Sequence, residues 1–177
     1  AAAVCFEAGE GDENVGVLSS ALHAQGEHAK SLMLEAPASR EMPRIDEQML
    51  KDRKHYPSMD GKTIFKNALK RLPDVTHEAL GMAGLELDDI DLFIPHQANL
   101  RINQFYQQSM KIPEGKVYNN IDKYGNTTAA TIPLALDEAI EQERVGPGST
   151  MMFFGLGAGL TWGASIYRWS GETPINL

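Results

Sequence analysis

Three shortages in the sequence limit what the protein can be: it lacks long apolar runs, an excess of basic residues, and any cysteine beyond one. No apolar run approaches the roughly 20 residues that a membrane-spanning helix needs, and no charged start followed by an apolar segment resembles a secretory signal. The net charge is −8, and no basic stripe is present that would release counterions from phosphates. We therefore expect a globular, cytoplasmic protein that binds neither nucleic acid nor membranes.

The one cysteine, Cys5, lies in an apolar run over residues 1–6 that is typical of a buried strand. A catalytic thiol needs an electropositive and partly exposed setting, and no neighbour of Cys5 supplies it. We therefore predict a buried structural cysteine. Residues 1–8 and 15–22 predict a hairpin with an acidic turn, and because the sequence opens inside its first strand we expect a piece of a longer polypeptide.

Segments with helical and strand-like spacing alternate along the chain, which predicts an α/β fold. A helical pattern over residues 60–83 contains Pro73, which should kink or divide it. A helix over residues 100–110 should place Phe105 and Met110 in the core. The other expected elements are a surface excursion over 36–57 with a short helix near 45–50, strands over 91–94, 117–119, 149–154 and 161–169, and a helix over 130–142 with Pro133 in its first turn.

His96 follows a strand and precedes a helix. The strand over 91–94 ends at Pro95, which cannot continue a central ladder. Open α/β sheets place their chemistry at the carboxyl ends of strands, where backbone N–H groups at helix starts face a crevice. A helix amino terminus disfavours imidazolium, so we expect His96 to stay neutral and to donate one hydrogen bond.

Asn126 lies among the small residues of segment 124–130. A neutral histidine N–H and an asparagine N–H₂ aimed at one point form an oxyanion site, which holds an enolate oxygen without a change of protonation. Both residues also have ordinary interpretations, since a histidine at a strand end can be purely structural and a Gly-Asn pair often forms a turn. The remaining histidines lack the spacing of metal ligands, so no metal is expected; they are His23, His28, His55 and His77.

The glycine-rich run over residues 155–159 superficially matches a dinucleotide-binding loop. Such a loop must open a helix, whereas a strand is predicted here, so we reject that interpretation. A turn between two strands that brings backbone N–H groups close to a ligand fits the pattern better.

Three motifs in this order and spacing resemble the carboxyl-terminal half of β-ketoacyl-acyl-carrier-protein synthase III; they are PHQANLRI at 95–102, YGNTTAA at 124–130 with PLAL at 133–136, and the run 157–163. The resemblance covers residues 1–177. It implies a thiolase-like fold of two similar halves, each a mixed sheet with flanking helices, usually in a homodimer.

The resemblance also implies a reaction, a decarboxylative Claisen condensation in fatty acid biosynthesis. A cysteine takes an acyl group from coenzyme A, after which malonyl-acyl carrier protein loses carbon dioxide and attacks the thioester. No cofactor is implied. By the same resemblance, His96 and Asn126 would donate hydrogen bonds to the enolate thioester, Asn99 would face the pantetheine arm, and Arg101 would contact the carrier protein.

The turn at Gly157 and Ala158 would lend a backbone N–H to the oxyanion of the acyl-cysteine. Ala158 and Leu156 stand where the family commonly has glycine and phenylalanine, which would reshape the acyl pocket. The nucleophilic cysteine of the family belongs to the amino-terminal half, which this sequence does not contain, and Cys5 matches no catalytic position.

The carrier-protein dock also departs from the family. Gln107 and Gln108 stand where lysines are common, so the expected basic dock is reduced to Arg101 with Lys111. Two alternatives remain beside a fatty acid synthase: a related enzyme that condenses other acyl thioesters for secondary metabolism, and a non-catalytic partner subunit that binds acyl carrier protein.

Overall fold

A four-stranded mixed sheet forms the centre of the computed structural model, which describes residues 1–6 and 14–170. The strands stand in the order β1-β6-β5-β4, with β4 parallel to β5 and the other neighbours antiparallel. Their bounds are β1 Gly16–Ala24, β4 Leu92–Pro95, β5 Thr150–Gly157 and β6 Thr161–Arg168. The predicted α/β class and the mixed sheet with flanking helices are confirmed.

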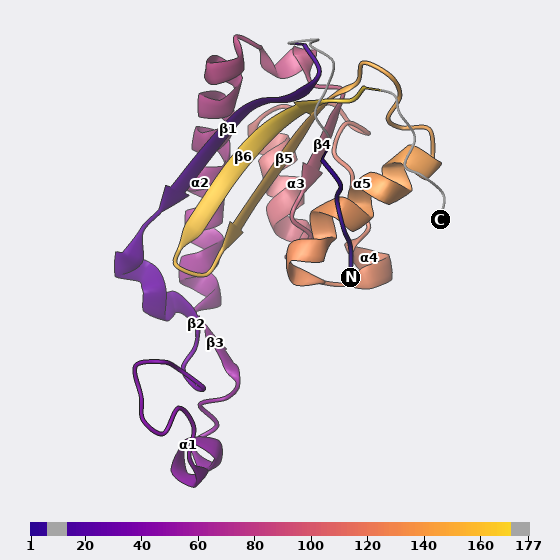
Figure 1. Cartoon of the computed structure of the whole chain (residues 1–177). Coiled ribbons are helices and arrows are strands. Elements are labelled where there is room, and N and C mark those ends of the chain that lie inside the picture. The colour runs from indigo at the N-terminus through magenta and orange to yellow at the C-terminus, as the bar shows by residue number, and fades with distance from the viewer. Residues whose placement is uncertain (7–13, 171–177) are drawn as a thin grey trace.

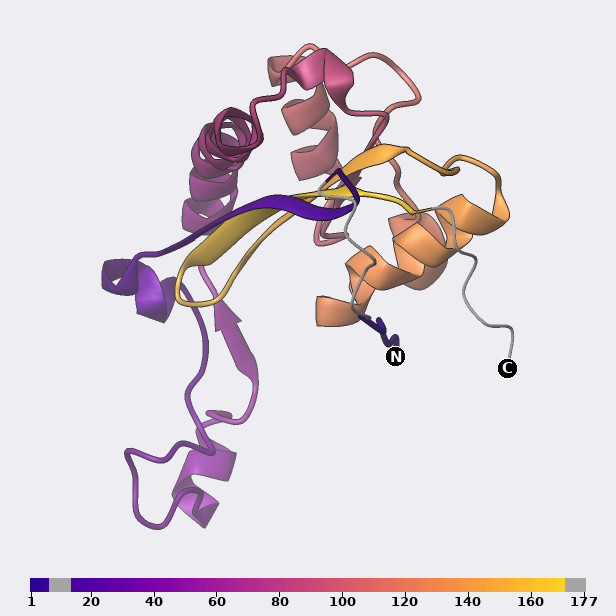
Figure 2. The same cartoon turned by 45° about the horizontal axis from the view of Figure 1, so that its top comes forward.

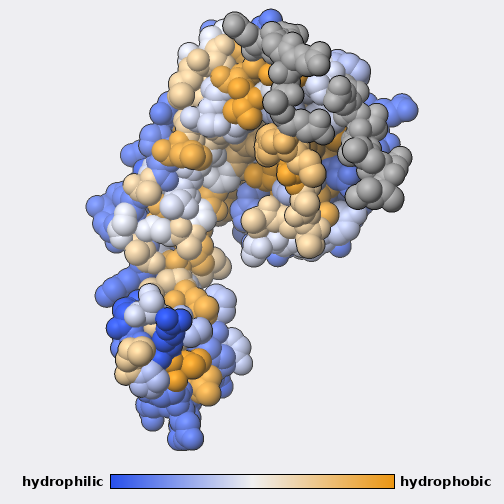
Figure 3. Space-filling model, in the orientation of Figure 1, coloured by the Kyte–Doolittle hydropathy of each residue, from blue (hydrophilic) through white to orange (hydrophobic). Residues whose placement is uncertain are grey.

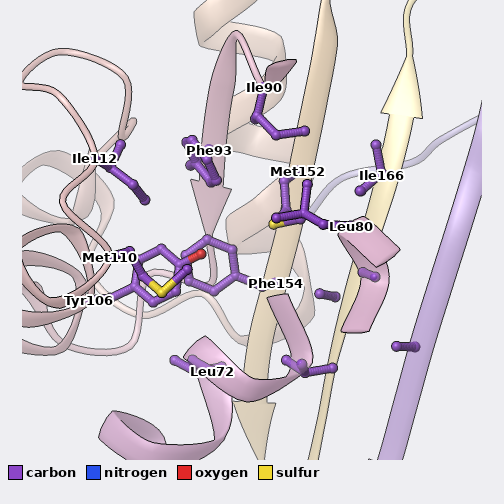
Figure 4. Packing of buried hydrophobic residues seen from close by; sticks show 14 of the residues in the cluster. Leu72, Leu80, Ile90, Phe93, Tyr106, Met110, Ile112, Met152, Phe154 and Ile166 are labelled. Carbon is purple, nitrogen blue, oxygen red and sulfur yellow. The ribbon is translucent and has the colours of Figure 1, made fainter. Parts of the chain in front are cut away.

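Helices cover both faces of this sheet (Figures 1 and 2). Helices α2 (Gly61–Ala83) and α3 (Leu100–Ser109) lie on one face, and α5 (Thr131–Glu141) lies on the other beside β4. The larger core, between the sheet and α2 with α3, includes Phe154 and Ile166 (Figure 4). Shorter helical elements are η2 Leu87–Asp89, α4 Ile121–Tyr124 and η3 Thr128–Ala130.

Helix α2 begins and ends where the sequence places its caps. The Asp60 carboxylate accepts the backbone N–H of Thr63, and Gly84 ends the helix with a left-handed φ of 66°. Pro73 does not divide the pattern, since one helix of 23 residues runs through it, and the alternative of a kink there stays a prediction. Leu72 and Val75, buried on either side of Pro73, hold the helix against the sheet.

The expected first strand is wrong for the residues that the structure describes. Residues 1–6 form no strand, and Cys5 is exposed instead of buried. Strand β1 pairs with β6 and forms the edge of the described sheet, and residues 1–6 join no ladder there, with Phe6 75% exposed, so their apolar character alone does not make them a strand. The predicted acidic turn lies almost entirely in residues 7–13, outside the described residues.

The helix expected over 100–110 is confirmed, but one of its two core residues is wrong. Met110 is buried, whereas Phe105 is 42% exposed and Tyr106 occupies the core in its place. The predicted segment near 117 is confirmed as one bridge, since Phe93 pairs with Val117 outside any longer strand. The helix near 130–142 has Pro133 in its first turn, as expected.

Residues 25–60 form an arm that projects from the body (Figures 1 and 2). Its elements are η1 Gly26–Ser31, β2 Leu32–Leu34, α1 Glu47–Lys51 and β3 Pro57–Met59, and β2 pairs with β3. The predicted surface excursion and its short helix are confirmed. Apolar side chains lie beside charged ones on its surface, as Figure 3 shows; Leu34, Met42, Ile45, Leu50, Tyr56 and Met59 are exposed. None of the described helices is long and apolar enough to cross a membrane.

A buried hydroxyl pair joins α2 to α3, and it generates the first prediction. Thr76 Oγ1 lies 2.8 Å from Tyr106 Oη, and both residues are almost fully buried. Tyr106→Phe should lower the free energy of unfolding by about 1–2 kcal/mol, because it leaves the Thr76 hydroxyl buried without its partner. Urea unfolding measures the change. The double variant Tyr106→Phe with Thr76→Val should recover part of the loss, and an equal or larger loss would contradict the role of this pair.

Candidate active site

His96 lies directly after β4, as the sequence predicts. Its backbone N–H donates to the carbonyl of Phe154 at 2.7 Å, which extends the parallel ladder one residue beyond Pro95. Asn99 then caps α3, since its side-chain oxygen accepts the N–H of Arg101. The imidazole is therefore held at the carboxyl edge of the sheet, between the end of β4 and the start of α3.

The surroundings of His96 are mostly apolar. The ring lines a cavity of about 40 Å³ between α2 and α3, together with Ile64, Ala68, Leu72, Pro95, Ala98, Ile102, Asn103, Phe154, Gly155 and Leu156. Burial lowers the pKa of His96 below its ordinary value, so the ring is neutral near pH 7. The neutral state was expected, and its cause is desolvation. The folded state disfavours protonation of His96. The contribution of His96 to the free energy of unfolding is therefore fully present above the ordinary pKa of histidine and is lost as the pH falls below it.

A buried amide fixes the backbone next to His96. Gln97 is 1% exposed, and its Nε2 donates to the carbonyls of Pro95 and Tyr118 at 2.9 and 3.2 Å. Its Oε1 accepts the N–H of Asn120 at 3.3 Å. No pattern in the sequence points to this residue, because two of its three partners, Tyr118 and Asn120, lie more than twenty positions along the chain.

Asn126 and His96 are joined by a chain of hydrogen bonds. The Asn126 Oδ1 accepts the N–H of Thr128 at 2.9 Å, and Thr131 Oγ1 lies 2.9 Å from the Thr128 carbonyl and 2.6 Å from His96 Nδ1. Asn126 thus makes the turn contact that a Gly-Asn pair favours, and this contact directs its amide nitrogen away from the Thr128 N–H. Whether both side chains serve one oxyanion stays a prediction.

Asn99 and Arg101 border a groove of about 670 Å³ beside the His96 cavity. Its walls come from α2 and from the start of α3, and its remaining lining residues are Gly61, Lys62, Phe65, Lys66, Leu69, Lys70 and Phe105. Residues 98–102 contribute to both hollows, so the groove and the cavity share one wall. The groove also explains why Phe105 is exposed.

The groove has more basic residues on its border than the expected dock of Arg101 with Lys111, and whether a carrier protein docks here stays a prediction. Three lysines of α2, Lys62, Lys66 and Lys70, border the groove with Arg101, whereas Lys111 does not line it. Their spacing of four residues places them on one helix face, a signal that the sequence carried. Their neighbour Arg101 follows some thirty residues later, so only the packing of α2 on α3 reveals the cluster.

The glycine-rich run forms the expected strand turn. Strand β5 ends at Gly157 and β6 begins at Thr161, whose hydroxyl donates to the carbonyl of Ala158 at 3.0 Å. Leu156 lines the His96 cavity, and it is followed directly by Gly157 at the end of β5 and by Ala158 in the turn. The rejection of a dinucleotide loop is confirmed, because a strand follows the glycines.

The other titratable candidates lie apart from these hollows. His23 Nε2 is 2.6 Å from Glu78 Oε2, and its ring stacks on Trp162. Cys5 lines neither the cavity nor the groove. Among residues 1–6 and 14–170, no three histidine, cysteine, aspartate or glutamate side chains are grouped as metal ligands.

Comparison with known proteins shows which family this chain belongs to. Residues 80–169, just over half of the chain, match the model for the family described as 3-oxoacyl-[acyl-carrier-protein (ACP)] synthase III C terminal. The chain belongs to this family. The synthase III from Roseiflexus castenholzii is 42% identical over 159 residues, which are 90% of this chain and 48% of that protein. A Fusobacterium nucleatum synthase III is 38% identical over 92% of this chain and 49% of its own length.

Solved synthase III structures share the fold. The Thermus thermophilus synthase III superposes with a TM-score of 0.81 at 38% identity, covering 93% of this chain and 49% of that one. The Aquifex aeolicus synthase III superposes with a TM-score of 0.76 at 35% identity, covering 90% of this chain and 46% of that one. The thiolase-like expectation is confirmed. The chain spans about half the length of the synthase III relatives it matches and corresponds to their carboxyl-terminal half.

Gly155 provides a test of how closely β5 approaches His96. A methyl group at this position would lie 3.0 Å from His96 Cβ, which is closer than ordinary contact. Gly155→Ala should displace the imidazole and lower the free energy of unfolding by about 1–3 kcal/mol, measured by urea unfolding and by the NMR shift of the His96 ring. Gly81→Ala is the matched control, because a methyl group there meets nothing within 4 Å and should not destabilise α2. An unmoved His96 resonance in Gly155→Ala would contradict the contact.

Proposed function

We propose that this chain is the carboxyl-terminal half of a condensing enzyme that joins an acyl thioester to malonyl-acyl carrier protein in fatty acid biosynthesis. The observation that carries the proposal is the half-buried His96 at the end of β4, whose pKa is lowered by desolvation and which is linked through Thr131 and Thr128 to Asn126. The family match and the synthase III relatives support the same reaction class.

The reaction needs hydrogen-bond donors that do not lose their protons. When the malonyl thioester loses carbon dioxide, the electron pair of the broken C–C bond enters an enolate whose oxygen carries negative charge. His96 and Asn126 would each donate a hydrogen bond to this oxygen, and the enolate carbon would then attack the acyl-cysteine and expel its thiolate. Neutral donors in an apolar pocket stabilise such a charge strongly, because they need little reorganisation.

The groove fits the carrier side of the substrate. A phosphopantetheine arm carries a phosphate, and carrier proteins are acidic, so both match the cationic rim of Arg101 with the three α2 lysines. Asn99 would face the arm where the groove meets the His96 cavity. The backbone at Gly157 and Ala158 would supply an N–H to the oxyanion formed at the acyl-cysteine.

The nucleophilic cysteine would come from an amino-terminal half of similar fold. On the α5 side of the sheet, several large side chains remain only partly buried: Ile132, Leu136, Ile140, Phe153, Tyr167 and Trp169. An apolar face of this size would be covered by the second half. We propose that the completed enzyme is a cytoplasmic homodimer without a cofactor.

A second function has one specific observation in its favour. The priming β-ketosynthase of the R1128 polyketide biosynthetic pathway superposes with a TM-score of 0.73 at 29% identity, covering 89% of this chain. Leu156 lines the His96 cavity and Ala158 lies just beyond it, so these two side chains would reshape an acyl pocket. Condensation products from a panel of acyl primers would distinguish this function from fatty acid synthesis. A non-catalytic subunit would bind acyl carrier protein and form no product.

His96→Ala in the completed enzyme tests the oxyanion role. Decarboxylation of malonyl-acyl carrier protein should fall at least about 100-fold, because the enolate loses one of its donors, while acylation of the cysteine should stay largely intact. Each half-reaction is measured separately, by release of carbon dioxide and by the mass of the acylated protein. His77→Ala, at an exposed position of α2, is the control and should change neither. Lost acylation with normal decarboxylation would contradict the assignment.

Lys66→Glu tests the groove. Charge reversal on its rim should raise the KM for malonyl-acyl carrier protein about tenfold at low salt, with a smaller effect on kcat, because it weakens encounter more than chemistry. Lys51→Glu, on α1 at the far end of the arm, is the matched control (Figure 1). Equal KM values for both variants would show that the carrier docks elsewhere.

A further inference from the structure

The turn between β5 and β6 lies beside the start of the arm and is paired with its first residue (Figure 1). The backbone N–H of Gln25 donates to the carbonyl of Leu160 at 2.8 Å, and the N–H of Leu160 donates to the carbonyl of Gln25 at 3.0 Å. These two bonds continue the β1–β6 ladder one rung beyond Ala24 and Thr161. Leu160 is also fully buried, so the turn that begins at Ala158 is anchored at its far end.

The side chain of Gln25 lies between a cation and an anion. Its Oε1 accepts a hydrogen bond from the Arg71 guanidinium, and its Nε2 donates to the Glu27 carboxylate. The opposite orientation of the amide would turn donor toward donor and acceptor toward acceptor, so the two charges decide which way it points. Hydrogen bonds to charged groups are also stronger than neutral ones. Arg71 therefore restrains the residue whose backbone pairs with the turn.

Arg71 also contacts β6 just after the turn. Its Cζ lies 4.1 Å from the centroid of the Trp162 ring, which is close enough for a cation–π contact. Its Nε donates to the Oδ1 of Asn67, one helical turn earlier on α2, at 3.1 Å. The guanidinium thus has partners on α2, on the arm and on β6. A planar group with five donors suits such a position better than an ammonium group does.

We propose that Arg71 is a positioning residue for the turn over residues 157–161, which it ties to helix α2 through Gln25 and Trp162. Helix α2 and strand β5 both line the His96 cavity. By linking α2 to the turn that follows β5, Arg71 fixes the spacing between two walls of this cavity. The turn would offer a backbone N–H to the acyl-cysteine, so the catalytic consequence rests on the function proposed above.

Hydrogen exchange at the Leu160 amide, followed by mass spectrometry with residue-level fragmentation, measures how firmly the turn is held. In the protein that carries both halves, this amide should exchange about tenfold faster in Arg71→Met, because Gln25 loses one charged partner. Arg71→Lys keeps the positive charge and should restore part of the protection. Arg144→Met is the matched control and should leave the exchange unchanged, because Arg144 also donates to a carbonyl and lies over an aromatic ring, but just after α5.

The two half-reactions separate a positioning role from a general loss of stability. Arg71→Met should lower the rate of cysteine acylation about tenfold, because the turn no longer holds its N–H in place, and should leave malonyl decarboxylation within about twofold. A loss of folded protein would instead lower both rates by the same factor. Gln25→Ala should reproduce the effect on acylation, and the double variant should lose little more, because both changes remove one contact.

Unchanged exchange at Leu160 in Arg71→Met would overturn the proposal, as would equal losses of acylation and decarboxylation. Gln25→Ala decides the matter in the same way if Arg71→Met does not fold. If Arg71→Met loosens the turn as expected but the native protein transfers no acyl group to its cysteine, the proposed function fails and the role of Arg71 in holding the turn stands.

Discussion

The parallel pairing of β4 with β5 is the constraint on which the site depends. All four residues of β4 are buried, and the strand is held on one side by β5 and on the other by the bridge at Val117. Because parallel strands bring their carboxyl ends to one edge, His96 meets Gly155 of β5 directly beyond the last rung. A slip of one residue in this register would turn the His96 side chain to the opposite face.

Each face of the sheet contributes something different at that edge. Helices α2 and α3, above the larger core, supply the apolar cavity and the cationic groove. Helix α5, on the other face, supplies the hydroxyl that binds His96. The buried Gln97 fixes the backbone between these contributions, and its amide has partners on both its oxygen and its nitrogen.

The local patterns predicted most of the architecture. The apolar run before Pro95, the Asp60 and Gly84 caps and the glycine turn each depend on nearby residues, and each prediction is confirmed. The prediction of a buried strand over residues 1–6 was wrong because an apolar run shows what could be buried but cannot show what it pairs with or packs against. The prediction of a buried Phe105 was wrong because adjacent positions on a helix point in directions about 100° apart. An error of one position in the expected buried face therefore exchanges Phe105 with Tyr106.

The site was predictable where a single motif carries it, and less so where distant elements meet. His96, Asn99 and Arg101 belong to one stretch, and the structure places them on adjoining hollows. The partnership of Thr131 with His96 spans 35 positions and depends on how α5 docks under β4. No spacing rule within one element could have revealed it.

The hydroxyl pair between Thr76 and Tyr106 has a consequence for how a ligand would enter the groove. It joins, inside the core, the two helices that form the groove's walls, so the backbone on both sides is fixed before anything binds. A ligand would then restrict the rotamers of the lysines at the rim, a cost of up to about 2 kcal/mol for each side chain, without ordering any main chain. The association rate of the ligand with the groove would then depend on diffusion and charge, because no folding step would slow binding.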